Sequence, residues 1–210
     1  MVGVFPQELD LFGFHISDTI VSTWVMIVLV TGAAFLVRRR WPAALEALLD
    51  FLASTISDVM GRPAEPYLPL LGSMAIFIGL ANVVGAIPVL TTPTGDINPP
   101  LALSIVVLFA VHYFGMREKG GLGYLKSLAS PIFMLPLEII GQLSRTLSLT
   151  LRLFGNTIST NIIVAVVFML LPAVVPLPAI AYNILTGAIQ AYIFIILTAV
   201  FIDQAVQANE

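Results

Sequence analysis

The longest uncharged segment of this chain sets its fold class, because no Asp, Glu, Lys or Arg occurs between Arg152 and Asp203. A helix that crosses a bilayer needs about 20 predominantly apolar residues. Shorter uncharged segments close to or above that length occupy residues 19–37, 66–95 and 97–116. We therefore predict an all-α polytopic membrane protein with about five membrane-embedded helices.

The composition excludes the soluble classes of protein. Only 10% of the residues are charged and 59% are apolar, whereas soluble domains carry about 25% charged residues. The formal net charge of −3 leaves no basic surface for nucleic acid. Cysteine is absent, which excludes disulfides and thiolate metal sites. We expect no cofactor and no nucleic-acid partner, and we expect the lipid bilayer to surround the chain.

The distribution of positive charge predicts the topology. Arg38, Arg39 and Arg40 follow the first apolar segment, and no basic region precedes it, so this segment does not resemble a cleaved signal peptide. Lys and Arg concentrate on the cytoplasmic side of membrane proteins. The N-terminus is then expected outside and the C-terminus inside. The segments predicted to lie outside carry no Lys or Arg: residues 1–18, 91–100 and 171–178.

Residues 43–60 differ from the membrane segments. Glu46, Asp50, Ser54 and Asp58 recur at every fourth position among apolar residues. This period predicts an amphipathic helix that is too polar to cross the bilayer. It would lie on the cytoplasmic membrane surface or contact a partner. We expect residues 1–210 to form a single integral membrane domain, in which residues 1–65 hold the N-terminal span and this interfacial helix.

Residues 131–170 are too long for an ordinary span. As one helix, 40 residues would extend roughly 60 Å, twice the hydrocarbon thickness of about 30 Å. Ordinary tilts of about 20° do not absorb this excess. We predict a long, strongly tilted helix, with Pro136 as a candidate kink near its start. Prolines at 172, 176 and 178 end it, and a second helix over 179–206 returns to the cytoplasm.

Polar residues on this long helix follow a helical period of three and four. Two amides on the next helix, Asn183 and Gln190, are seven residues apart and also share a face. The stripe on the long helix consists of Glu138, Gln142, Arg145, Ser148, Arg152, Asn156 and Ser159.

Arg152 is the most informative residue of the stripe. An arginine at mid-membrane costs about 2.5–3.5 kcal/mol on insertion scales, and its guanidinium stays charged. It must face water, a carboxylate or a partner protein. Glu138 is 14 residues away, roughly 21 Å along a helix, which is too far for pairing within one straight helix. Arg152 is then a structural or snorkelling residue, the anion site of a stand-alone transporter, or the partner of a carboxylate on another chain.

Several segments resemble one family. Residues 147–156, Leu-Ser-Leu-Thr-Leu-Arg-Leu-Phe-Gly-Asn, resemble the signature of subunit a of F-type ATP synthases. The order and spacing of the motifs fit this family from about residue 66 to the C-terminus, and the first third fits only in topology. The other similar segments are residues 82–88, 93–103 and 189–194.

The resemblance implies a fold and a mechanism. Subunit a is the membrane stator of the Fo sector, beside a rotating c-ring, and it provides two offset half-channels to the c-ring carboxylate. Arg152 matches the arginine that keeps this carboxylate ionised and prevents an ion short-circuit. Residues 66–210 would form the ion channel. The implied partners are the c-ring, the b subunits of the peripheral stalk and the whole F1Fo complex. The chain would not be an enzyme by itself, and the absence of a transit peptide favours a bacterial inner membrane.

The resemblance also assigns roles residue by residue. Gln190 and Asn156 match amides near the arginine; they would otherwise be helix–helix hydrogen-bond partners. Glu138 and Arg145 match polar positions of the cytoplasmic half-channel, and Ser148 lies on the same stripe. A further residue, Asp96, matches an aspartate of the outer half-channel, where the alternative is an ordinary turn residue.

The chain departs from the family pattern at two positions. Asn161 and Asn183 occupy sites where many members carry a titratable glutamate and histidine. Asn161 lies nine residues after Arg152, about 180° around the helix, so it would line a different channel from the stripe. Amide oxygens suit a hard cation. The transported ion is expected to be H⁺, with Na⁺ as the alternative.

Overall fold

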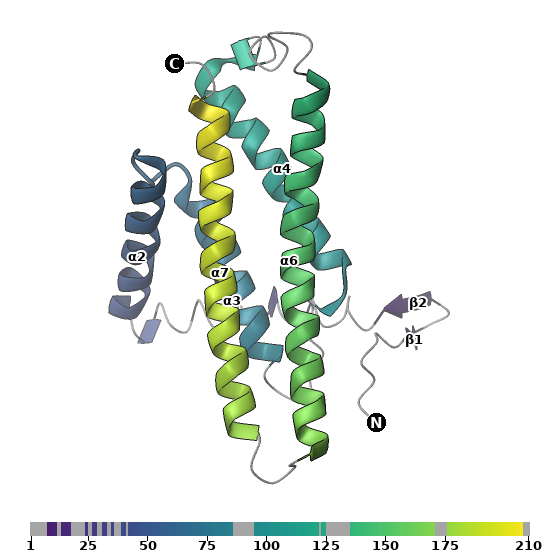
Figure 1. Ribbon diagram of the computed structural model, residues 1–210. Helices are drawn as coiled ribbons and strands as arrows, with labels where there is room; N and C mark the ends of the chain where they lie inside the picture. Colours follow the sequence, from purple (N-terminus) through teal and green to yellow (C-terminus); the bar gives the residue numbers. More distant parts are fainter. Residues whose placement is uncertain are drawn as a thin grey trace.

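The computed structural model describes residues 8–11, 14–17, 42–85, 95–121, 123–124, 135–170 and 176–207, with single helical residues between 24 and 40. Figure 1 shows five long helices that carry the fold. The predicted all-α class is confirmed. The elements are β1 (Glu8–Leu11), β2 (Phe14–Ser17), α2 (Pro42–Met60), α3 (Leu68–Gly85), α4 (Asn98–Lys119), α6 (Leu135–Leu170) and α7 (Pro176–Gln207).

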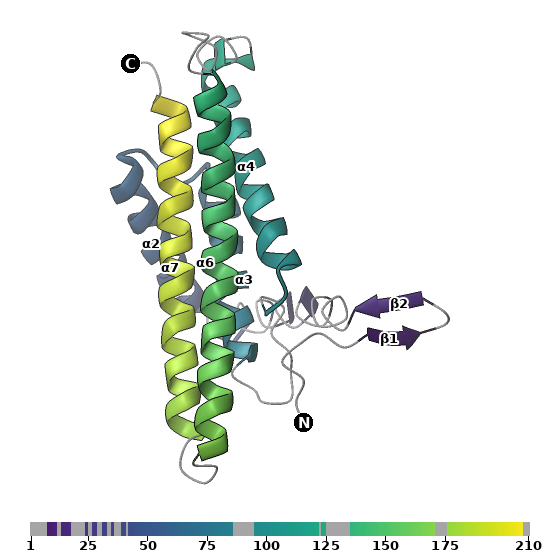
Figure 2. The same ribbon diagram turned by 45° about the vertical axis from the view of Figure 1, so that its right-hand side comes forward.

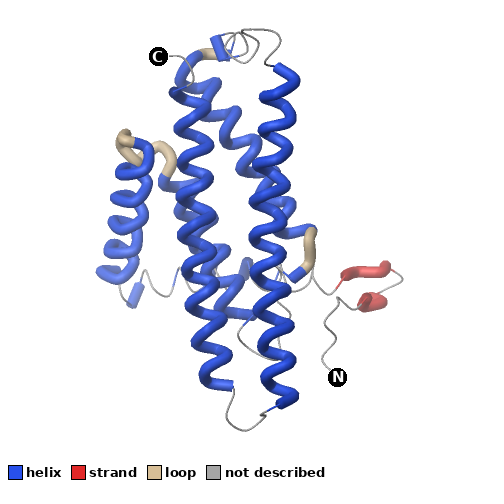
Figure 3. Tube along the Cα trace, viewed as in Figure 1, coloured by secondary structure: helices blue, strands red, loops and turns tan. Residues whose placement is uncertain are grey.

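The sequence analysis missed the two short strands near the N-terminus. β1 and β2 pair antiparallel, with Glu8 opposite Ser17 and Leu11 opposite Phe14. Figure 3 draws this hairpin in red beside the blue helices. Each strand has only four residues, too few for a reliable alternating pattern, and a two-stranded hairpin is marginally stable alone.

Three described helices are long and apolar enough to cross a membrane, and α3 is a shorter apolar helix. This supports the polytopic membrane class. The first expected span, residues 19–37, lies largely outside the described residues. The three long segments are Asn98–Lys119, Pro136–Val167 and Ala181–Gln207.

The two last helices form the long hairpin that the sequence predicted. α6 has 36 residues and α7 has 32, so at 1.5 Å per residue they extend about 54 and 48 Å. They run side by side in both views (Figures 1 and 2). Because a hydrocarbon core is about 30 Å thick, helices of this length fit a bilayer only at a steep tilt.

Prolines begin these helices rather than break them. Pro136 lies in the first turn of α6, so it does not kink the helix interior. α7 begins at Pro176, three residues earlier than predicted, and Pro178 lies in its first turn. A proline fits the first turn because the backbone N–H it lacks has no intrahelical partner there. The same reason places Pro99 at the start of α4.

α2 confirms the predicted amphipathic helix, which begins one residue earlier at Pro42. Its acidic stripe is exposed, whereas Leu52, Ile56 and Met60 are buried. Phe51 stacks on Tyr192 of α7, with ring centroids 6.3 Å apart. The apolar face of α2 is therefore fixed against α7 while its polar face remains free.

The core lies where α3 and α4 pack on α7. Phe194 is fully buried at its centre, with Leu71 and Ile78 from α3 and Val111 from α4. α3 and α7 approach each other closely at Gly187, where a Cβ atom would lie 2.3 Å from the Cβ of Asn82. Glycine at 187 is thus required by the neighbouring helix.

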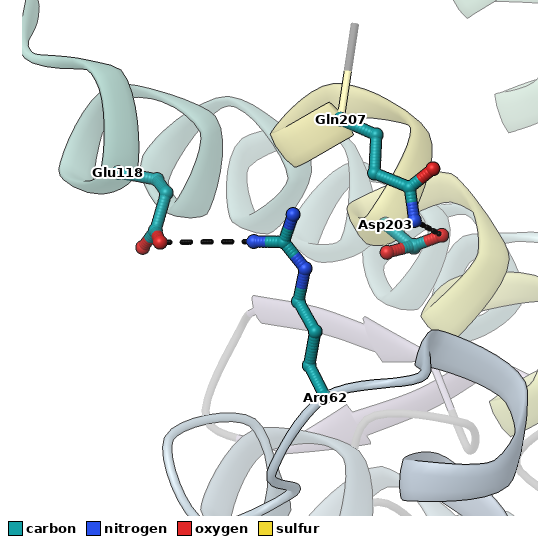
Figure 4. Close-up of polar contacts among 4 residues, drawn as sticks. All are labelled: Arg62, Glu118, Asp203 and Gln207. Atoms are coloured by element: carbon teal, nitrogen blue, oxygen red, sulfur yellow. Dashed lines mark hydrogen bonds and ion pairs between the residues drawn. The ribbon is translucent and has the colours of Figure 1, made fainter. Parts of the chain in front are cut away.

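Four polar residues lie near one another (Figure 4): Arg62 and Glu118 form an ion pair between the loop after α2 and α4, and Gln207 and Asp203 form a hydrogen bond within α7. Arg62 Nη1 lies 3.7 Å from Glu118 Oε1, and Gln207 Nε2 donates to Asp203 Oδ2 at 2.7 Å. Tyr67 is buried beside them. Burial raises the pKa of the Tyr67 hydroxyl above its usual value, and the nearby Glu118 carboxylate adds to this rise, so Tyr67 is neutral at physiological pH.

We expect Glu118→Gln to change stability little. The Glu118 side chain is 56% exposed, and exposed ion pairs contribute about 0.2–1 kcal/mol. The measurement is the midpoint of thermal unfolding of the detergent-solubilised complex, at low and high salt. A large, salt-independent decrease would show instead that the pair is shielded from water in the assembled complex.

Candidate functional site

The outer face of the α6–α7 hairpin is apolar and uncovered. Leu147 is 55% exposed, Leu151 is 58% exposed and Ile189 is 49% exposed. An exposed apolar face of this extent contacts lipid or another protein. Arg152 lies on it, exposed, between Leu151 and the buried Leu153.

Arg152 has no hydrogen-bond or ion-pair partner among the residues that the structure describes. Glu138, the acid on its own stripe, instead accepts a hydrogen bond from Gln142 Nε2 at 3.0 Å. Glu138 and Arg152 therefore form no ion pair with each other, as their distance along the helix predicted. A permanent cation is placed on an apolar surface, and the described part of the chain does not neutralise it.

The polar stripe runs along the edge between this outer face and α7. Ser148 and Ser159 are exposed, whereas Glu138, Arg145 and Asn156 are half-buried. The guanidinium carbon of Arg145 lies 5.2 Å from the centre of the Phe201 ring on α7. The stripe thus contacts α7 at Arg145 and is exposed at Ser148 and Arg152.

The hairpin places Asn156 of α6 and Gln190 of α7 at about the same height. Arg145 of α6 contacts Phe201 of α7, and both are 28 positions along the chain from residue 173. Residue 173 is also the middle position of the segment that joins α6 to α7. Residues equally far from this midpoint lie at about the same height in an antiparallel hairpin. Asn156 is thus level with Gln190, and Arg152 is one turn away, roughly 6 Å along α6.

Gln190 and Asn183 are both buried on one face of α7, with exposed fractions of 5% and 6%. The predicted shared face is confirmed. The Gln190 Nε2 atom is buried without a hydrogen-bond partner. Since buried amide groups are normally paired, this donor is available to water or to a partner group. No hydrogen bond joins Gln190 to Arg152 within the described residues.

Asn161 lies on the other side of α6, beside the turn that precedes α4. A Cβ atom at Gly95 would lie 3.6 Å from Asn161 Nδ2 and 4.0 Å from Thr157 Cγ2. Asp96, next to Gly95, accepts hydrogen bonds through Oδ1 from the backbone and side-chain nitrogens of Asn98. Asp96 is therefore a turn residue, as one interpretation held, and it also lies near Asn161.

Two buried threonines of α6 lie on the side of the helix that carries Asn161, and they were not singled out from the sequence. Thr150 and Thr157 are 2% and 3% exposed. Each hydroxyl donates to the carbonyl four residues earlier in the helix. Leu149 and Leu153, also buried, complete this side of α6. Phe201 was missed as well, because an aromatic residue in an apolar helix carries no sequence signal.

No group of three or more His, Cys, Asp or Glu that could hold a metal ion occurs among the described residues. The chemistry available is that of two permanently charged arginines, one half-buried carboxylate and several amides. The carboxylate and the amide oxygens can attract and solvate a small cation, whereas the arginines repel a cation and attract an anion. They form no nucleophile–base pair within the described part of the chain.

The comparisons with known proteins agree with one another. A family model described as ATP synthase A chain matches residues 15–203. ATP synthase subunit a 2 of Bradyrhizobium sp. is 43% identical over 206 residues, which cover 92% of each chain. The protein of the same name from Picosynechococcus sp. is 40% identical and covers 93% of this chain and 88% of its own. ATP synthase subunit a 1 of Chlorobaculum parvum is 38% identical, over 91% and 89%.

Proposed function

This chain belongs to the ATP synthase A chain family, and from that premise we propose that it is the ion-translocating stator subunit in the membrane Fo sector of a rotary ATP synthase. The observation that carries the proposal is Arg152, a cation that lies on the exposed apolar face of a long hairpin and has no ion-pair partner among the described residues. A rotating ring that presents carboxylates to this face would supply the missing negative charge.

The proposed role of Arg152 is to hold the passing carboxylate in its ionised form. At about 4 Å and an effective dielectric constant near 20, the two charges attract by about 4 kcal/mol. This corresponds to a preference of roughly three pKa units for the ionised carboxylate, and desolvation offsets part of it. A neutral, ion-loaded carboxyl group would not pass this point, so ions could not leak directly between the two sides.

The cytoplasmic half-channel, in this proposal, follows the stripe of α6. Glu138, Arg145 and Ser148 line its entrance, and Asn156 and Gln190 solvate the ion near Arg152. The half-buried state of Glu138 supports its place at the entrance. The unpaired Nε2 of Gln190 is a buried donor that could hold a water or the ring carboxylate beside the ion.

The outer half-channel is proposed on the opposite side of α6. Asp96 directly follows Gly95, which lies beside Asn161, and Asn183 would continue the path within the bundle. Because neither asparagine titrates, the ion would cross on water and amide groups. We propose H⁺ as the transported ion and keep Na⁺ as the alternative, since amide oxygens also suit a hard cation.

The proposed setting follows from the same function. The partners are the c-ring and the b subunits of the peripheral stalk within the whole F1Fo complex, and this chain contributes no ATP chemistry by itself. We propose a multi-pass location in a bacterial inner membrane, with the N-terminus outside and the C-terminus cytoplasmic. Residues 1–210 would act as a single membrane domain.

A stand-alone anion transporter is less well supported. Such a protein would bring several polar groups of one chain around Arg152. Within the described residues, no side chain forms a hydrogen bond or ion pair with Arg152, and the nearest polar stripe also contains an acid, Glu138, which would repel an anion.

Cross-linking tests the proposed ring contact directly. The chain contains no cysteine, so Ser148→Cys introduces its only thiol. We expect this exposed position to form a disulfide with a cysteine placed beside the carboxylate of the c subunit. Thr150→Cys is the matched control, because Thr150 is only 2% exposed on the opposite side. Equal cross-linking of both variants, or of neither, would contradict the assignment of the outer face to the ring.

A further inference from the structure

Arg145, like Arg152, brings a positive charge into a membrane helix, but its guanidinium group contacts an aromatic ring. It is a permanent cation on a membrane helix, half-buried, and no described acid forms an ion pair with it. The acid on its own face, Glu138, is seven residues away, about two turns. Asp203 lies only two residues from Phe201 on α7, but it is on another side of that helix and accepts its hydrogen bond from Gln207.

The structure places an aromatic ring where a counter-ion is expected. The Arg145 guanidinium carbon is 5.2 Å from the centre of the Phe201 ring. A cation within about 6 Å of a ring centre is attracted by the negative face of the ring, and the attraction grows when water is excluded. Phe201 is half-buried, on the same face of α7 as Gln190, eleven residues away.

This contact has a consequence for Glu138. An arginine and a glutamate two turns apart on one face are within reach of each other when both side chains extend along the helix. In this structure Arg145 turns toward α7 instead, and among the described residues Glu138 accepts a hydrogen bond only from the neutral amide of Gln142. The carboxylate of Glu138 therefore has no cationic partner in the described part of the chain.

We propose that Phe201 is a positioning residue for ion transport: its ring holds the Arg145 guanidinium against α7, so that Arg145 does not pair with Glu138 and the Glu138 carboxylate stays open to the transported cation. This inference rests on the proposed function, because it assigns Glu138 to the ion path. Without the ring, Arg145 would turn to Glu138, and the resulting ion pair would close the path.

The first test is Phe201→Leu in the whole complex, reconstituted in liposomes and driven by ATP. We expect the pumping rate to fall about 2- to 30-fold, the range that one cation–π contact spans. Phe201→Trp should recover most of the rate, because its ring also attracts the cation. Phe109→Leu is the matched control: Phe109 is 69% exposed on α4 and should leave pumping unchanged.

A double-mutant comparison separates positioning from packing. In an Arg145→Gln background there is no cation to hold, so Phe201→Leu should cause little further loss of pumping. If Phe201 acts only through packing, the same fold-loss should occur in both backgrounds, and the proposal would be wrong.

Phenylalanines that carry one, two or three ring fluorines at position 201 give an independent measurement. Fluorine withdraws charge from the ring face with little change in size. We expect the pumping rate to fall stepwise with each fluorine, whereas a packing role predicts no trend. A flat series overturns the positioning of Arg145, even where the Arg145→Gln variant is itself too slow to compare.

Arg152→Ala, measured beside these variants, keeps the two proposals distinguishable. If Arg152→Ala pumps normally, the stator function fails regardless of position 201. If Arg152→Ala is inactive and the fluorine series is flat, only the role of Phe201 fails.

Discussion

Arg152→Ala is expected to abolish coupled ion transport while the soluble motor continues to hydrolyse ATP. The alanine variant would remove the attraction of about 4 kcal/mol that keeps the ring carboxylate ionised at the stator. Ions would then pass between the half-channels without turning the ring. The measurement is ATP-driven pumping by the whole complex in liposomes, followed with a pH-sensitive dye and with radioactive sodium uptake.

The two readouts also decide the identity of the ion, because only one tracer should respond in the unmodified complex. Arg117→Ala serves as the matched control, since Arg117 is an exposed arginine in the last turn of α4 and outside the hairpin. It should pump normally. Normal pumping by Arg152→Ala would instead make this arginine structural and would end the proposed mechanism.

Gly187→Ala is expected to have the largest effect on stability. The added Cβ atom would lie 2.3 Å from the Cβ and 2.9 Å from the Cγ of Asn82. Both contacts are far inside van der Waals distance, and neither belongs to a flexible side-chain end. Overpacking of this kind costs about 1–3 kcal/mol or more. We expect a lower unfolding temperature and less assembled complex, measured in detergent extracts.

Two further variants test whether the contact between α3 and α7 causes the loss of stability in Gly187→Ala. Gly79→Ala, in the same helix as Asn82, would meet nothing within 4 Å and should be tolerated. Asn82→Gly removes the atom that clashes, so the double variant with Gly187→Ala should regain assembly. If the single Gly187→Ala variant assembles as well as Gly79→Ala does, the helices are further apart than described.

The sequence predicted the parts of this molecule that depend on local pattern. The long helices follow from uncharged segments, and the polar stripe of α6 from its period of three and four. The same period correctly placed Asn161 on the opposite side from Arg152, where the structure shows it beside Gly95. The helix starts were missed by a few residues, because prolines were read as breaks although they also fit a first turn.

Contacts between distant segments could not be predicted in this way. Gly187 has no local reason to be glycine, and only the approach of Asn82 explains it. Arg145 was predicted to line a channel together with Glu138, which stays a proposal, but its contact with the Phe201 ring had no basis in the sequence pattern. An aromatic residue fifty-six positions later along the chain carries no mark of such a role. These features depend on how the helices pack, not on any short pattern.

The buried side of α6 bears on a second requirement of the proposed function, which is that ions do not leak. The hydroxyls of Thr150 and Thr157 donate to carbonyls of the same helix, so these two donors are already used. With Leu149 and Leu153 these side chains are almost fully buried, and in the proposed function this packing would keep water away from that side of α6. Each elementary charge that leaks through the membrane dissipates about 2.3 kcal/mol of stored free energy per 100 mV of membrane potential. In the proposed stator subunit, α6, the helix that carries Arg152, would also prevent this loss.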